Sequence, residues 1–122
     1  MKNNVVKIKS YAFAVRMIRM YKHPYQEKRE FVLSKQVLRS GTSIGANLEE
    51  AEAAISKADF SSKISVAYKE ARETSYWLRL LYETDYIDKK SFDSIFKDVE
   101  EICKLLFTIL KSSGRVRAMN NE

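Results

Sequence analysis

Residues of the types that most often carry catalysis are scarce in this 122-residue chain. Its one histidine, His23, lies in a segment expected to form a turn, and its one cysteine, Cys103, lies at the margin of an apolar helix face. A metal site or a nucleophile–base pair needs several such groups in one place. The acids Glu49, Glu50 and Glu52 spread around a helix and do not converge either. The sequence therefore predicts no catalytic residue, no metal site and no cofactor.

Basic side chains are concentrated in one part of the chain. Residues 1–40 hold ten basic and two acidic residues, and the whole chain has a net charge of +6. Six of these cations form two helical stripes that could follow a phosphate backbone: Lys9, Arg16, Arg19, Lys28, Lys35 and Arg39. A solvated face that only keeps the protein soluble explains the pattern equally well, and no RNA-binding motif with interleaved aromatic residues is present. Binding to phosphates, rather than to base edges, is one of two interpretations.

A second polar group surrounds two glycines, Gly41 and Gly45. Polar side chains recur there at three- and four-residue steps along one helix face: Ser40, Ser43, Asn47 and Glu50. The glycines would let a neighbouring backbone approach closely. The segment lacks the Gly-Lys-Ser/Thr ending of a phosphate loop. We expect a polar network that fixes helix pairing, with a ligand or RNA contact as the alternative.

Long helices must position these residues, because three glycines and one proline leave few turn signals. Apolar periodicity predicts four helices and a tail, at about 5–22, 27–55, 57–84, 89–112 and 113–122. Pro24 should end the first helix. The second should run through both glycines, since its apolar stripe continues to Ile55. Short connections favour a single domain over 1–122, an all-α, antiparallel up-down-up-down four-helix bundle.

Local signals support the last two helices. Ser56 and Asp59 have the spacing of a capping box at the start of the third helix, and Asp88 is expected to cap the fourth. The fourth helix also carries acid-first pairs four residues apart, a spacing that stabilises helices: Asp93–Lys97 and Glu100–Lys104.

Apolar residues occupy more than one face of the first and third predicted helices. The first has one stripe made of Ile8, Tyr11, Val15 and Ile18, and another on the opposite side. A four-helix bundle buries one stripe per helix, so the second stripes would form a large exposed patch. We assign to this patch Phe13, Met17, Met20, Val66, Trp77 and Leu80. The patch predicts a homo-oligomer.

Four runs of sequence are similar to one known family: Arg39-Ser-Gly-Thr-Ser-Ile-Gly-Ala-Asn-Leu-Glu-Glu-Ala51, Lys57-Ala-Asp-Phe-Ser-Ser-Lys63, Ala67-Tyr-Lys-Glu-Ala71 and Tyr76-Trp-Leu-Arg-Leu-Leu81. Over about residues 8–112 the chain resembles the 23S rRNA intervening-sequence proteins of bacteria. The resemblance implies a small cytoplasmic bundle that assembles into a homopentameric ring, in a family without an established activity. A related branch resembles the accessory proteins of diversity-generating retroelements, basic pentamers that bind a reverse transcriptase and nucleic acid.

Charge and resemblance together predict a non-enzymatic, basic, oligomeric bundle that binds structured RNA or a ribonucleoprotein. The alternative is a scaffold that docks a protein partner, such as a reverse transcriptase, and an enzyme is the least favoured class. No apolar run approaches the ~20 residues of a membrane-spanning helix, and the N-terminal segment does not resemble a secretory signal. A single cysteine fits a reducing compartment. We therefore expect a cytoplasmic protein without membrane contact.

Overall fold

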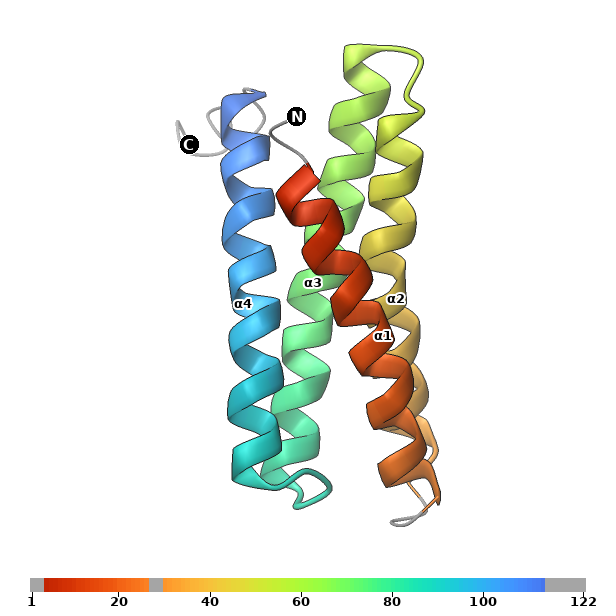
Figure 1. Ribbon diagram of the computed structural model, residues 1–122, viewed down its shortest axis with the longest axis vertical. Coiled ribbons are helices and arrows are strands. Elements are labelled where there is room, and N and C mark those ends of the chain that lie inside the picture. The colour runs from red at the N-terminus through yellow and green to blue at the C-terminus, as the bar shows by residue number, and fades with distance from the viewer. Residues whose placement is uncertain (1–3, 27–29, 114–122) are drawn as a thin grey trace.

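The computed structural model describes residues 4–26 and 30–113, which form four helices. These are α1 (Asn4–Gln26), α2 (Val32–Glu52), α3 (Lys57–Glu83) and α4 (Lys89–Ser112). Successive helices run in opposite directions (Figure 1). The all-α, up-down-up-down four-helix bundle expected from the sequence is therefore confirmed. The predicted tail beyond residue 113 lies outside the described residues.

The first helix is longer than the sequence suggests. α1 continues to Gln26, past the predicted end at residue 22, although Pro24 lies within it. Proline removes one backbone donor and crowds the carbonyl one turn earlier, which is most costly in a helix interior. Only two residues follow Pro24 in α1, so little of the helix depends on the missing hydrogen bond. His23 is helical, and the turn expected at this residue is wrong.

The second helix begins at Val32 rather than at residue 27, because a carboxylate caps it there. Glu30 accepts hydrogen bonds from the backbone N–H groups of Val32, Leu33 and Ser34 at 3.2, 3.0 and 2.6 Å. Burial on its own would raise the pKa of Glu30, but these donors outweigh it and lower the pKa below its ordinary value. The negative charge at the helix N-terminus also favours this start.

The turn between α2 and α3 explains why α2 ends early. Its last residue is Glu52, and Ile55, which was expected to extend the buried stripe, is 94% exposed. The Asp59 backbone N–H donates to Ser56 Oγ at 3.0 Å, and the Asp59 carboxylate accepts from the Ile55 N–H at 3.2 Å. The Ser56 cap is confirmed, whereas the acid reaches back to the N–H of Ile55, one residue before the cap, and the chain leaves the helical conformation before Ser56.

The connection between α3 and α4 follows the predicted boundaries closely. The Ser91 backbone N–H donates to the Asp88 carboxylate at 2.7 Å, which confirms Asp88 as the cap of α4. Asp85 reverses the chain in the left-handed region, with a φ of 68°. Aspartate tolerates this conformation better than most residues with a side chain.

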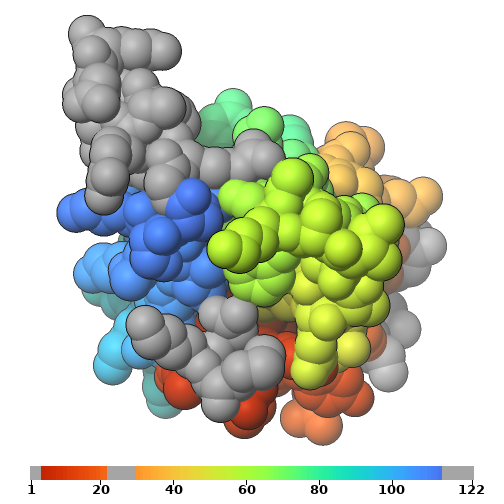
Figure 2. Space-filling view, turned by 90° about the horizontal axis from the view of Figure 1, so that it is seen from above, coloured from red at the N-terminus to blue at the C-terminus, as the bar shows by residue number. Residues whose placement is uncertain are grey.

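One apolar stripe from each helix fills the centre of the bundle. Its largest fully buried members are Phe13, Met17, Ile44, Ile64, Leu78, Leu81, Ile95, Ile102 and Leu106. α2 and α3 pack together most extensively, whereas α1 packs more on α2 than on α4 and crosses the other helices at an angle (Figure 1). Seen end-on, the α2–α3 turn lies beside the end of α4, with α1 next to both (Figure 2). The packing interface between α1 and α4, called the seam below, is therefore less extensive than that between α1 and α2.

The crossing of α1 over α2 uses the two glycines. A Cβ atom on Gly41 would stand 2.6 Å from Cγ of Met17, and one on Gly45 would stand 3.6 Å from the Ser10 carbonyl oxygen. The close approach of a neighbouring backbone is confirmed at Gly45, and α2 runs unbroken through both glycines. Gly41 instead makes room for the Met17 side chain.

The polar stripe beside the glycines joins α2 to α3 at two of its four positions. The Thr74 hydroxyl donates to Ser40 Oγ at 2.8 Å, and Glu50 pairs with Lys63 at 3.2 Å. The other two stripe members donate to carbonyl oxygens of their own helix: Ser43 and Asn47. The expected network that fixes helix pairing is present in part.

Candidate nucleic-acid interface

Two of the cations predicted to bind nucleic acid join α1 to α4. The Lys9 ammonium lies 2.6 Å from the Glu101 carboxylate. Arg16 pairs with Asp98 and donates a hydrogen bond to Ser94 Oγ at 3.0 Å. The hydrogen bond between Lys9 and Glu101 raises the pKa of the lysine and lowers that of the glutamate. Each cation is neutralised by an acid of the same chain, so neither offers a free charge to a phosphate.

A third predicted cation, Arg39, joins α2 to α3. Its guanidinium pairs with Glu70 at 3.0 Å and with Glu73. Glu73 also accepts a hydrogen bond from Nε1 of Trp77 at 3.0 Å. Arg39 is therefore the centre of an interhelical polar cluster, and its charge is balanced within the bundle.

The remaining three predicted cations are scattered. Arg19 on α1 and Lys35 on α2 are exposed, and neither forms an ion pair with another described residue. Lys28 lies outside the described residues. The two basic stripes drawn from the sequence do not form one continuous free surface, because half of their members are paired across helix boundaries.

A different set of cations, on α4, has no ion-pair partner among the described residues, and no function was expected of it from the sequence. This lysine row consists of Lys90, Lys97, Lys104 and Lys111. All four are exposed, and none forms an ion pair with the described part of the chain. A seven-residue step returns to nearly the same side of a helix, so the row follows one face at intervals of ~10.5 Å. That face lies opposite the buried stripe of α4.

The acids that the sequence would pair with the lysine row are engaged elsewhere. Asp93 pairs with Lys89 at 2.7 Å, and Glu100 accepts a hydrogen bond from Ser75 on α3 at 3.0 Å. The predicted ion pairs of Asp93 and Glu100 with the lysines four residues later are therefore wrong. The seven-residue spacing alone could have revealed the row.

The lysine row begins at a cleft between α1 and α4, near the α3–α4 connection. The cleft has a volume of about 710 Å³, and its cations are Arg16, Arg19 and Lys90. Arg16 is paired, whereas Arg19 and Lys90 form no ion pair within residues 4–26 and 30–113. The one acid in the lining, Asp88, caps α4. The structure thus brings one predicted cation, Arg19, next to one that sequence reasoning missed, Lys90.

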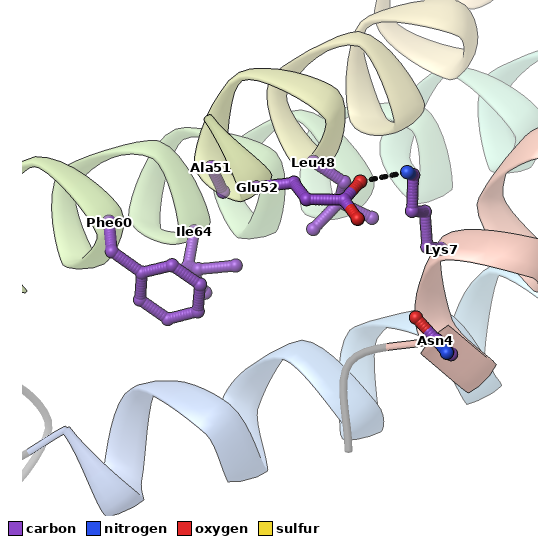
Figure 3. Close-up of a pocket in the computed structure, with 7 residues that line it drawn as sticks. All are labelled: Asn4, Lys7, Leu48, Ala51, Glu52, Phe60 and Ile64. Carbon is purple, nitrogen blue, oxygen red and sulfur yellow. Dashed lines mark hydrogen bonds and ion pairs between the residues drawn. The ribbon is translucent and has the colours of Figure 1, made fainter. Parts of the chain in front are cut away.

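A small cavity near one end of the bundle has too little room to be a ligand site. It lies where the start of α1 meets the end of α2 and the beginning of α3 (Figure 3). Its volume of about 20 Å³ has room for little more than one water molecule. Lys7 lies at its edge, where its ammonium bonds Glu52 and lies 3.3 Å from Glu49. The lysine fastens α1 to α2 here.

The predicted oligomer interface is wrong for two of its residues on α1. Phe13 and Met17 are 1% and 0% exposed, because they pack in the protein's own core. Met20 is partly buried against the same core. Two opposite apolar stripes look equivalent on an isolated helix, and only the docking of α1 on α2 decides which of them is buried.

The opposite stripe of α1 is the exposed one. The α1 outward face carries four of the large exposed apolar side chains, Val5, Ile8, Tyr11 and Ile18. Ile8 and Tyr11 are 69% and 72% exposed. On α3 the other predicted interface residues lie on or near the surface: Val66 exposed, Trp77 and Leu80 partly buried. The apolar surface exists, but on α1 it uses the stripe that the sequence analysis had assigned to the core.

The one cysteine of the chain, Cys103, is buried in the bundle. Burial and the nearby Glu100 carboxylate raise the pKa of the Cys103 thiol to about 11, so it stays protonated at neutral pH and is a poor nucleophile. Within the described ranges no group of three or more His, Cys, Asp and Glu side chains is placed to hold a metal ion. None of the helices there has a stretch both long and apolar enough to cross a bilayer.

Known proteins place the chain in a family. The family model of the 23S rRNA-intervening sequence protein matches residues 2–108. A crystal structure from Bacteroides thetaiotaomicron, of a protein with unknown function from the S23 ribosomal protein family, is 58% identical with a TM-score of 0.88. The match covers 91% of this chain and 99% of that one. Comparison with curated proteins gives no match. Because the family model spans most of the chain, the protein belongs to the 23S rRNA-intervening sequence protein family.

Proposed function

We propose that the protein is a non-enzymatic, oligomeric RNA-binding bundle whose lysine row on α4 contacts the phosphates of structured RNA. The observation that carries this proposal is the row itself, four exposed cations on one helix face with no ion pair in the described chain. Arg19, which lines the cleft at the start of the row and has no ion pair in the described chain, extends the same positive surface towards α1. Membership of a family named for 23S rRNA insertions agrees with an RNA ligand.

The row favours phosphates over base edges. Lysine ammonium groups are compact charges on flexible stems, which suits many phosphate positions and fixes no bidentate geometry. Binding should therefore depend steeply on salt and weakly on base sequence. The chain has a single cysteine, which fits a reducing compartment, and this agrees with a protein that binds RNA in the cytoplasm.

Matched lysine variants test the proposal. We expect the triple variant Lys90→Gln, Lys97→Gln and Lys104→Gln to weaken binding to a labelled RNA hairpin, measured by fluorescence anisotropy over a salt series. The slope of log affinity against log salt should become shallower by about 2 to 3, which is ~0.7–0.9 for each lost phosphate contact.

The control removes the same number of charges from lysines that are already paired: Lys7, Lys9 and Lys63, each to Gln. Net charge falls equally in both triple variants. Only the row variant should show the shallower salt slope. If the two variants lose affinity to the same extent, net charge and not the row governs binding, and the proposal fails.

Self-association is the second part of the proposal, and the α1 outward face supports it. Side chains such as Ile8 and Tyr11 gain about 1.5–3 kcal/mol each when a partner buries them, before ordering costs. An exposed apolar stripe of this kind is typical of an interface. The resemblance adds the expectation of a homopentameric ring. Sedimentation equilibrium measures the mass directly, and a species of 14.2 kDa, the mass of one chain, would contradict it.

A protein-docking scaffold is the second candidate function, and the same face favours it. If sedimentation gives a monomer, the α1 outward face is left for a different protein. A reverse transcriptase is the partner to test first, because a related branch of the family resembles the retroelement accessory proteins that bind one. Retention of that partner by the monomer, with no RNA retained at low salt, would favour the scaffold over the RNA-binding bundle.

A further inference from the structure

An aromatic groove lies between α3 and α4 near their connection, and α4, the helix that carries the lysine row, forms one side of it. Its volume is about 470 Å³. Four rings and two charged side chains line it, together with Leu80: Tyr76, Arg79, Tyr82, Glu83, Phe92 and Phe96. The function proposed above makes no use of this groove.

Three of the four rings of the groove form a stack. Tyr82 of α3 stacks on Phe92 of α4, with centroids 4.4 Å apart and planes 11° apart, and Phe92 stacks on Phe96 at 4.9 Å and 26°. This stack bridges the two helices, so the bundle itself holds the rings in place. Tyr76 stands nearer to solvent, 48% exposed.

A guanidinium lies next to the exposed ring. Cζ of Arg79 is 5.7 Å from the centroid of Tyr76, within the range of a cation–π contact. Arg79 forms no ion pair with the described residues. Lys97 of the lysine row directly follows Phe96 in the sequence. The groove therefore offers flat aromatic faces with free positive charge at its edge, and Glu83 is the one acid that lines it.

Aromatic faces beside cations are the surface that unpaired nucleic acid needs. Bases that are not stacked in a duplex stack on Tyr, Phe and Arg side chains, while the backbone follows a positive surface. Paired bases stack on each other and leave no face for such a groove. The free positive charge favours a polyanion over an apolar segment of a second copy.

We propose that this groove binds unpaired nucleobases of an RNA whose phosphates lie along the lysine row. The inference rests on the proposed RNA binding and narrows its ligand to single strands, loops or bulges. It assigns Tyr76 and Arg79 as base-stacking residues and the lysine row as the contact to the backbone.

Two RNA probes and two variants test this inference. The probes are an unpaired oligonucleotide and a blunt duplex with the same number of phosphates, and their affinities are measured by fluorescence anisotropy at one salt concentration. We expect the wild type to prefer the unpaired probe by about tenfold or more, as base–aromatic stacking predicts. Tyr76→Leu, which keeps apolar volume but removes the ring, should abolish most of this preference without weakening duplex binding. Tyr76→Phe should keep it.

A fluorescent base reports stacking directly. An unpaired probe carrying 2-aminopurine should lose fluorescence on binding to the wild type and to Tyr76→Phe, and lose much less with Tyr76→Leu. Circular dichroism and sedimentation of the three proteins check that folding and assembly are unchanged. If Tyr76→Leu alters the assembly instead of the probe preference, the groove contacts another copy of the chain, and the inference is overturned.

The remaining outcomes separate the two proposals. If both probes bind with equal affinity and Tyr76→Leu has no effect, RNA binding stands and the base-binding groove is wrong. If neither probe binds at any salt concentration, the proposed function fails, and the groove has no RNA ligand.

Discussion

The outward faces of α1 and α4 expose different kinds of side chain: apolar residues on α1 and lysines on α4. On α1 the outward face is apolar, with Ile8 69% and Tyr11 72% exposed, while the cations Lys9 and Arg16 lie at its edge and pair with acids of α4. On α4 the acids Asp98 and Glu101 are used in those pairs, and the outward face keeps the lysine row. The two helices meet along a seam where opposite charges cancel.

This difference shows that charge in a sequence segment is a poor guide to charge at a surface. Residues 1–40 carry the positive excess of the chain, yet half of their six predicted phosphate-binding cations are balanced within the bundle. The free row lies in the later part of the chain, where acids outnumber bases. An apolar face whose neighbouring charges are paired, as on α1, can associate with another protein surface. A face that carries only positive charges, as on α4, repels a copy of itself and attracts a polyanion.

The largest effect is expected when charge is placed on the apolar face. The double variant Ile8→Glu with Ile18→Glu should convert the proposed oligomer to a 14.2 kDa monomer with unchanged helical circular dichroism. Each buried isoleucine is worth about 1.5–3 kcal/mol, and a carboxylate adds a desolvation cost. Sedimentation equilibrium measures the result. Ile55→Glu, at an isoleucine of the α2–α3 turn that is 94% exposed and is not part of the α1 outward face, should leave the mass unchanged. An unchanged mass for the double variant would show that association does not use this face.

A smaller effect is expected at the crossing that decides which stripe of α1 is buried. A Cβ on Gly41 would lie 2.6 Å from Met17, a fully buried side chain, whereas one on Gly45 has only ordinary contacts. Gly41→Ala should lower the free energy of unfolding by about 1–3 kcal/mol, as overpacking does. Gly45→Ala should change it by less, or raise it by up to ~1 kcal/mol through helix propensity. Urea unfolding measures both, and a greater loss for Gly45→Ala would contradict this account of the crossing.

The smallest effect is expected at the seam between the two faces. The hydrogen bond from Lys9 lowers the pKa of Glu101 below its ordinary value of 4.5, so the folded state binds this proton less readily than the unfolded state. The pair therefore stabilises the fold above about pH 4.5 and loses its contribution as the pH falls through the lower, folded pKa.

Thermal unfolding of Glu101→Gln tests this pH dependence. The variant should melt slightly below the wild type at neutral pH, and the difference should disappear in acid, because an exposed pair contributes little and only while both groups are charged. Glu83→Gln, at an exposed acid without an ion pair in the described chain, is the control and should show no such pH-dependent difference. A difference for Glu101→Gln that persists in acid would show that the seam does not depend on this charge pair.

Local pattern was sufficient for most of the fold. Apolar periodicity located all four helices, and the caps at Ser56 and Asp88 were read from neighbouring residues because a cap joins groups only three positions apart. The predicted helix ends were least accurate where a second local interaction opposed the signal that was used to place them. Pro24 did not end α1, and two helical residues follow it although one backbone hydrogen bond is lost. Glu30 caps α2, so this helix begins later than periodicity suggested.

The candidate surfaces depended on contacts that no local pattern contains. The sequence alone determined that α1 has two apolar stripes, that α4 carries lysines at seven-residue steps, and that the chain is basic. Only the tertiary structure decided that Phe13 and Met17 are buried while Ile8 and Tyr11 are exposed, and that Arg16 is neutralised by Asp98, 82 residues away. The physical reason is that periodicity reports which residues share a face of one helix, whereas burial and charge pairing depend on which other helix that face meets.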